Sequence, residues 1–210
     1  MSAPRPAGGG VIPTGLPRLA RGRHTEPDTG SCLMEYVSVL AGRRFSDHPR
    51  CTHPLLGWLA RRVNDAVSDR ARAQLVAVAP ALIGTRTRHR GVRVMIYGQI
   101  ARAGLAAAPG DRWLREFDDL TRDHLARLAE PHSEHRPVPT SRRWGQPLLT
   151  IDRNFAFGCL SDVLDTLDTA ERDLLLLGLL AGSVHDYRRC LGLPTVPAET
   201  QETITSSVIS

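Results

Sequence analysis

Apolar residues recur every three or four positions through most of this chain, and this spacing is the strongest constraint on its fold. Between residues 54 and 67 it places Leu55, Leu59 and Val63 along one stripe. Arg61 falls on the opposite face, as expected of a helix that buries one side. No stretch of useful length alternates apolar and polar residues as a half-buried strand would. The fold is therefore predicted to be all-α.

Glycine, proline and helix-capping residues divide this pattern into about seven helices. The predicted helices are one that Thr29 or Ser31 caps and that runs to Ala41, followed by residues 54–67, 69–84, 92–107, 111–129, 152–167 and 170–190. Pro80 is expected to limit or kink the third of them. The 210 residues, 41% of them apolar, suffice for one good core. We predict a single-domain helical bundle without a sheet.

The helical domain is predicted to span residues 29–193. Residues 1–28 are rich in proline and glycine and poor in apolar spacing, so we expect a disordered N-terminal arm. Residues 130–150 contain several prolines that break every periodicity, which predicts a long Pro-rich loop inside the domain. Residues 194–210 are rich in serine and threonine and are expected to form a disordered tail.

The charge of the chain favours an acidic partner. The net charge is +5, and all 27 basic residues are arginine. Aromatic residues make up only 5% of the chain and do not alternate with arginine, so nucleic acid is compatible with the charge but not favoured. No apolar run approaches the roughly 20 residues of a membrane span, and the first residues lack a signal-peptide core. We expect a cytoplasmic protein without membrane contact.

Residues 30–55 concentrate the side chains most suited to chemistry. Glu35 is the only charged residue between Gly30 and Gly42, so its carboxylate needs a cation, a metal ion or hydrogen-bond donors if that helix is buried. Zinc accepts cysteine, histidine and carboxylate ligands, and iron accepts the histidine and carboxylate subset. One interpretation is therefore a metal site formed by Cys32, Glu35, Asp47, His48, Cys51 and His53.

Two other interpretations fit the same residues. In the first, Cys32 and Cys51 are small buried side chains, and Glu35 accepts hydrogen bonds from the backbone or from Arg61 or Arg62. In the second, one of the two cysteines is a nucleophile with His48 or His53 as its base. The spacing also lacks the paired CxxC or HxxxH that makes a zinc pattern specific. Asn64 and Asp65, further along, are expected to mark either a helix end or a buried hydrogen-bond network.

Four arginines stand where the predicted helix 92–107 begins. They are Arg86, Arg88, Arg90 and Arg93. Cations at the positive end of a helix dipole are unfavourable unless an anion or solvent screens them. The cluster is either a solvated basic loop or a surface that binds an acidic protein or a phosphate-bearing ligand. Our first functional hypothesis is a binding or regulatory protein that uses this surface, and the alternative is a metal-dependent enzyme at residues 32–53.

Several short motifs carry a resemblance. The runs CLME at 32–35, LAG at 40–42, SDHP at 46–49, VND at 63–65 and IGTR at 83–86 stand together with Cys51 and Pro54. In these motifs the chain resembles a group of uncharacterised proteins from actinobacteria and their phages. The resemblance covers about residues 29–88. It implies that this helical unit recurs as a module, and it implies no activity and no catalytic residue.

Overall fold

The computed structural model describes residues 15–87, 91–129 and 152–195. Within these ranges the backbone forms eight α-helices and two short 3₁₀ helices, without a sheet. The β structure found in these ranges is an isolated β-bridge between Leu19 and Ser31. The predicted all-α bundle is confirmed for this part of the chain. No helix in these ranges has both the length and the apolar character needed to cross a membrane.

Most helices lie where the apolar spacing predicts them. They are α1 (Leu33–Leu40), α2 (Pro54–Ala66), α3 (Asp69–Gln74), α4 (Ala79–Leu82), α5 (Val92–Ala107), α6 (Arg112–Ala129), α7 (Arg153–Leu164) and α8 (Thr169–Cys190), with the 3₁₀ helices η1 (Pro27–Thr29) and η2 (Leu75–Ala77). The predicted helix 69–84 is the exception, because α3, η2 and α4 divide it. Pro80 lies in the first turn of α4. Backbone N–H groups in a first turn have no partner within the helix, so the missing N–H of proline costs no helical hydrogen bond there.

Side-chain oxygens cap two helices, with Ser68 at the start of α3 and Asp152 at the start of α7. At α2 the cap is His53, whose side chain accepts from a backbone N–H. The Thr52 hydroxyl donates to the carbonyl of Leu82 at 3.1 Å and so ties the start of α2 to the end of α4.

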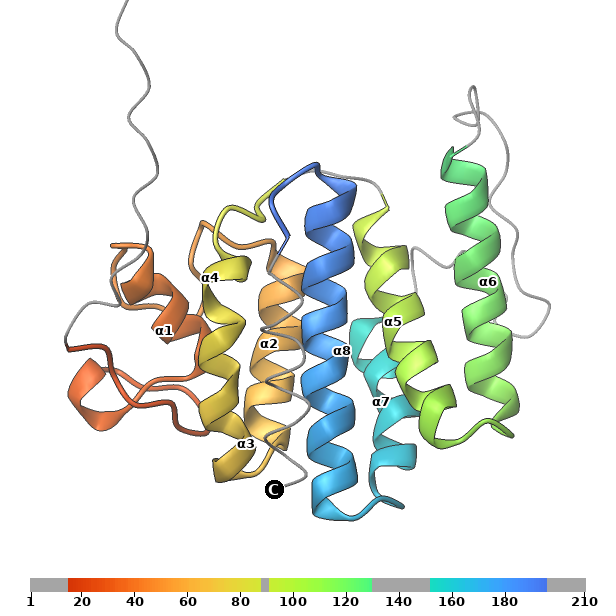
Figure 1. Cartoon of the computed structure of the whole chain (residues 1–210), viewed down its shortest axis with the longest axis horizontal. Helices are drawn as coiled ribbons and strands as arrows, with labels where there is room; N and C mark the ends of the chain where they lie inside the picture. The colour runs from red at the N-terminus through yellow and green to blue at the C-terminus, as the bar shows by residue number, and fades with distance from the viewer. Residues whose placement is uncertain (1–14, 88–90, 130–151, 196–210) are drawn as a thin grey trace, which may run out of the picture.

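Helix α8 lies at the centre of the arrangement (Figure 1). It contacts α2 and α4 on one side and α5 on the other, while α5 also packs against α6 and α7. Helix α1 packs against α2 and α4 at the far edge. One connected cluster of buried apolar side chains runs through these helices, from Leu33 in α1 to Tyr187 in α8. The described helices therefore share a single core.

Part of the segment expected to be a disordered arm lies against this core. In residues 15–28 Pro17 is buried. The backbone N–H of Ala20 donates to the carbonyl of Ser31 at 2.7 Å, and Ser31 donates to the carbonyl of Arg18 at 2.9 Å. These are backbone hydrogen bonds, which leave no apolar periodicity in the sequence. The predicted loop 130–150 and the tail from residue 196 lie outside the described residues.

Gly104 sets how closely α5 can approach its neighbours. A Cβ atom at this position would lie 2.5 Å from Cδ1 of Leu114 in α6 and 3.4 Å from Cδ1 of Leu160 in α7. Real Cβ atoms do not approach other carbon atoms to 2.5 Å, because close-packed interiors leave no such overlap. The contact between α5 and α6 therefore depends on the absence of a side chain at Gly104.

We predict that Gly104→Ala lowers the free energy of unfolding by about 1–3 kcal/mol, since the added methyl group overpacks this contact. Gly158→Ala is the matched control, because no atom lies within 4 Å of the Cβ that it adds to α7. The control should be neutral or raise stability by up to about 1 kcal/mol. Urea unfolding of both variants checks this. A Gly104→Ala protein as stable as the control would contradict the close approach.

Candidate anion-binding surface

Glu35 is buried, with 1% of its surface exposed. Its Oε2 atom accepts a hydrogen bond from the backbone N–H of Cys32 at 2.7 Å, and its Oε1 atom accepts one from the backbone N–H of His24 at 2.9 Å. The Nδ1 atom of His24 also lies 3.1 Å from Oε2. The carboxylate is therefore held by backbone donors and a histidine, which is the structural role that one interpretation of the sequence gave it.

The start of α1 explains why the carboxylate points this way. The Sγ atom of Cys32 accepts from the backbone N–H of Glu35 at 3.5 Å, while Glu35 accepts from the backbone of Cys32. This reciprocal arrangement is a capping box, so neither Thr29 nor Ser31 caps the helix as predicted. His24 was missed as a partner because residues 1–28 were expected to be disordered. A buried carboxylate's need for several donors is the signal that points to a further contact.

The arginines expected to pair with Glu35 bind elsewhere. The guanidinium of Arg61 donates to the backbone carbonyl of Asp47 at 2.5 Å. The guanidinium of Arg62 donates to the side-chain oxygen of Asn154 at 3.0 Å and so links α2 to α7.

The six residues considered as metal ligands do not converge. Asp47 lies 2.8 Å from Nδ1 of His48, and the Cys51 thiol lies 3.8 Å from the Thr52 hydroxyl. The Nδ1 atom of His53 accepts from the backbone of α2. In the described part of the chain no three histidine, cysteine or acidic side chains are arranged to hold a metal ion. The arrangement gives no support to a zinc or iron site at residues 32–53.

Cys32 does not have the environment of a nucleophile. Burial raises the pKa of its thiol to about 12, and the nearby Glu35 carboxylate raises it further. A thiol must ionise to attack an electrophile, and ionisation is favoured by exposure and neighbouring positive charge. At neutral pH Cys32 is therefore protonated, and its sulfur serves as the cap of α1.

Asn64 is buried, and with the half-buried Asp65 it forms a hydrogen-bond network, which is one of the two roles that the sequence left open for the pair. Asn64 Oδ1 accepts from the backbone N–H of Leu33 at 3.1 Å, and its side-chain NH₂ donates to the carbonyl of Ala20 at 3.0 Å. Asp65 accepts from the backbone N–H of Gly22 at 2.9 Å. The pair thus joins α2 to the start of α1 and to the segment that precedes it.

The arginine surface consists of Arg86, Arg88, Arg90 and Arg93 at the start of α5. Arg86 and Arg93 are exposed, and Arg88 and Arg90 lie in residues 88–90, outside the described residues. The N-cap residue of α5 is Gly91, which has no side chain that could cap the helix. The positive end of the helix dipole and the arginines therefore meet at one end of the bundle, which is at the top in Figure 1.

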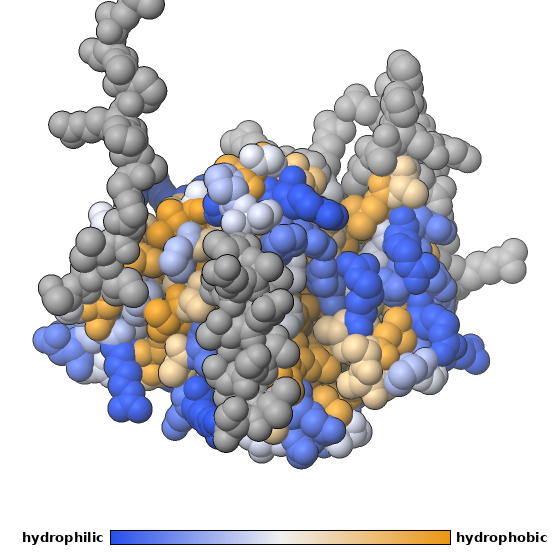
Figure 2. Space-filling view, viewed as in Figure 1, coloured by the Kyte–Doolittle hydropathy of each residue, from blue (hydrophilic) through white to orange (hydrophobic). Residues whose placement is uncertain are grey.

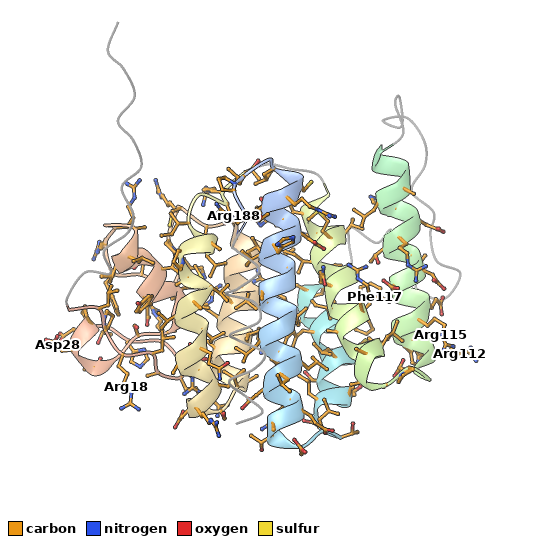
Figure 3. The ribbon with its side chains drawn as sticks, viewed as in Figure 1. Arg18, Asp28, Arg112, Arg115, Phe117 and Arg188 are labelled. Atoms are coloured by element: carbon orange, nitrogen blue, oxygen red, sulfur yellow. The ribbon has the colours of Figure 1, made fainter. Side chains whose placement is uncertain are left out.

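Helix α8 fixes the chain that leads into this surface. The Tyr187 hydroxyl donates to the carbonyl of Thr85 at 2.9 Å. The guanidinium of Arg188 donates to the carbonyls of Ala81 and Ile83, which end α4, at 2.9 and 3.1 Å. Figure 3 places Arg188 at this end of the molecule. Tyr187 thus holds the residue before Arg86, and Arg188 holds the end of α4.

Tyr187 and Arg188 did not stand out in the sequence. A cation in the last turn of a helix usually interacts with the carbonyls of its own helix, and Arg188 has that position in α8. It binds the terminal carbonyls of α4 instead, about a hundred residues earlier in the chain. Only the packing of α4 against α8 brings these groups together, so no local pattern could reveal the contact.

His53 lies beneath the arginine surface. Its ring is 5.6 Å from the Tyr187 ring, and its backbone N–H donates to the Thr85 hydroxyl at 3.2 Å. Burial lowers the pKa of the imidazole below its ordinary value, and the charge of Arg86 lowers it further. His53 therefore reports the positive potential at the start of α5 and is neutral at pH 7.

Comparisons with protein-family models, with curated proteins and with solved structures found no match to this chain. The class of protein that can be stated is therefore the one that the fold defines, an all-α bundle.

We predict that Arg86→Ala raises the pKa of His53 toward its ordinary value of 6.5, while burial keeps it below that value. The shift is measured by NMR titration of the imidazole ring protons. Arg112→Ala, which removes an exposed arginine from the start of α6, is the control and should leave the titration unchanged. An unchanged pKa in Arg86→Ala would contradict the potential assigned to this surface.

The lowered pKa also predicts how stability depends on pH. His53 has a pKa near 6.5 in the unfolded chain and a lower pKa in the folded protein. As the pH drops below 6.5, the unfolded chain therefore binds the proton more readily than the folded protein does, and stability falls. His53→Asn keeps a capping acceptor and removes the titrating group. Its unfolding free energy should therefore fall less between pH 7 and pH 5 than that of the wild type in urea titrations. Equal losses would contradict the assignment.

Proposed function

We propose that this protein is a binding or regulatory protein that meets an acidic protein or a phosphate-bearing ligand through the arginine surface. The observation that carries the proposal is the position of Arg86 and Arg93 at the positive end of α5, on chain that α8 holds in place. A rigid base lowers the conformational entropy that binding would cost. Exposed arginines there are suited to carboxylate and phosphate groups.

Two further features support this use of the surface. Neither Arg86 nor the exposed Arg189 in the last turn of α8 forms an ion pair with another residue that the structure describes. The large exposed apolar side chains of the described residues, Trp113 and Phe155, belong to α6 and α7. Among the described residues, the arginine surface therefore has no aromatic platform of the kind that binds single-stranded nucleic acid.

The proposal is tested with two labelled probes, inorganic polyphosphate and poly-glutamate of similar charge. We expect at least one of them to bind, with an affinity that falls steeply between about 50 and 200 mM NaCl as screening increases. The double variant Arg86→Ala/Arg93→Ala should weaken binding about tenfold, which corresponds to about 1.4 kcal/mol. Adding Arg88→Ala and Arg90→Ala should abolish it. Fluorescence polarisation gives the dissociation constants.

The matched control is Arg112→Ala/Arg115→Ala, which removes the same charge from exposed positions at the start of α6, away from Arg188 (Figure 3). This control should bind as the wild type does, and circular dichroism should show both double variants folded. Binding of neither probe would contradict the proposal. An equal loss in both double variants would reduce the effect to net charge and would also contradict it.

A further inference from the structure

A pocket of about 520 Å³ lies where α7 ends and α8 begins. The corner between α2 and α3 and the side chain of Arg21, from the segment before α1, complete its walls. Helix α8 begins at the lower edge of the molecule, whereas the arginine surface lies at the top (Figure 1). Figure 2 shows hydrophilic side chains along this lower edge. We call it the charged pocket, and nothing in the proposed function depends on it.

One wall of the charged pocket is held by its own polar contacts. Asp173 of α8 accepts hydrogen bonds from the backbone N–H of Ser68, at 2.9 Å, and from its hydroxyl. Arg72 is buried, donates to the carbonyl of Asn64 at 2.8 Å and forms an ion pair with Asp69. The corner between α2 and α3 is therefore fixed against α8, and the charges of Arg72 and Asp69 are used within the wall.

The guanidinium group of Arg172, near the start of α8, lines the pocket without a partner of its own. Its Nε atom is buried and has no hydrogen-bond acceptor, and the guanidinium forms no ion pair with any residue of the described ranges. A buried donor without an acceptor destabilises the folded state, so a bound acceptor would be favoured here. Arg21 is exposed at the same pocket, and its side chain likewise has no described partner. Two arginines from separate segments can thus bind one oxyanion.

Carboxylates of opposite charge line the same pocket. Asp165, at the end of α7, is exposed, and its carboxylate forms no hydrogen bond or ion pair with the residues that the structure describes. Asp65 accepts hydrogen bonds from the backbone N–H of Gly22 and from the side-chain amide of Asn64, which are both neutral donors. The pocket therefore presents positive and negative groups that do not pair with one another.

The pocket also has an apolar part. Phe157 and Leu164 of α7 are buried and contribute to its lining. The Phe157 ring packs edge-on against Trp58 of α2, with 5.8 Å between the ring centroids, so its position is fixed. A simple anion would satisfy the arginines but would face the carboxylates unfavourably. A small zwitterion with an apolar side chain matches all three parts of the pocket.

We propose that the charged pocket binds a free apolar amino acid. The α-carboxylate accepts hydrogen bonds from the guanidinium groups of Arg172 and Arg21, whose planar geometry matches a carboxylate. The α-ammonium group donates to Asp165. The side chain of the ligand lies against Phe157 and Leu164, where it is removed from water.

A heteronuclear NMR titration of the wild-type protein tests this with leucine, valine, methionine and phenylalanine, each added to about 20 mM. At least one of them should shift the amide signals of Ser161, Asp165 and Arg172 saturably, with a dissociation constant of about 1 mM or less. Its N-acetyl derivative lacks the ammonium group and its amide lacks the carboxylate, so each should bind at least about tenfold more weakly. No saturable shift with any of the four would overturn the proposal. Equal binding of the N-acetyl derivative would also overturn it, because the site would then be one for anions alone.

Two variants assign the two charged groups of the ligand. Arg172→Gln should lose the preference for the amino acid over its amide, and Asp165→Asn should lose the preference over the N-acetyl derivative. The controls are Arg189→Gln, at an exposed position at the other end of α8, and Asp162→Asn, at an exposed position of α7 outside the pocket lining. Both controls should keep both preferences. Unchanged preferences in Arg172→Gln and Asp165→Asn, or equal losses in the controls, would contradict the proposal. The wild-type titration decides it even where a variant does not fold.

Discussion

A carboxylate in an apolar interior must accept hydrogen bonds, and the way Glu35 does so organises one side of this protein. Its donors are the backbone of Cys32, which begins α1, and the backbone and imidazole of His24. Removing these donors would leave a buried charge without compensation, at a cost of about 3–5 kcal/mol. The segment before α1 is therefore part of the domain, and Asn64 and Asp65 hold it from the other side.

Helix α8 has a comparable role for the rest of the fold. Its inner leucines fill the core, and its last turn supplies Tyr187 and Arg188 to the loop that leads into α5. One helix thus supports the arginine surface at its end and contributes Arg172 to the charged pocket near its start. The arginine surface carries one sign of charge, whereas the pocket carries both. The two lie at opposite ends of the bundle, so a partner at one need not disturb the other.

The sequence predicts the helices well and the contacts between them poorly. Apolar spacing located nearly all the helices because it reflects the burial of one face, but it passed over the break between α3 and α4, where η2 keeps the same apolar positions buried. The sequence also singled out Glu35 as a carboxylate that needs partners if its helix is buried. It did not reveal His24, because that contact joins a segment without periodicity to the core through a backbone N–H. The proposed ligands between Cys32 and His53 are close in sequence, yet their side chains have separate partners.

The central claim is that Glu35 attaches residues 18–31 to the helical core, and amide hydrogen exchange of the wild-type protein tests it most directly. The His24 amide donates to the Glu35 carboxylate, so it should exchange far more slowly than the exposed amide of Thr25, with protection close to that of the Cys32 amide. A His24 amide that exchanges as fast as in an unstructured peptide would contradict the account.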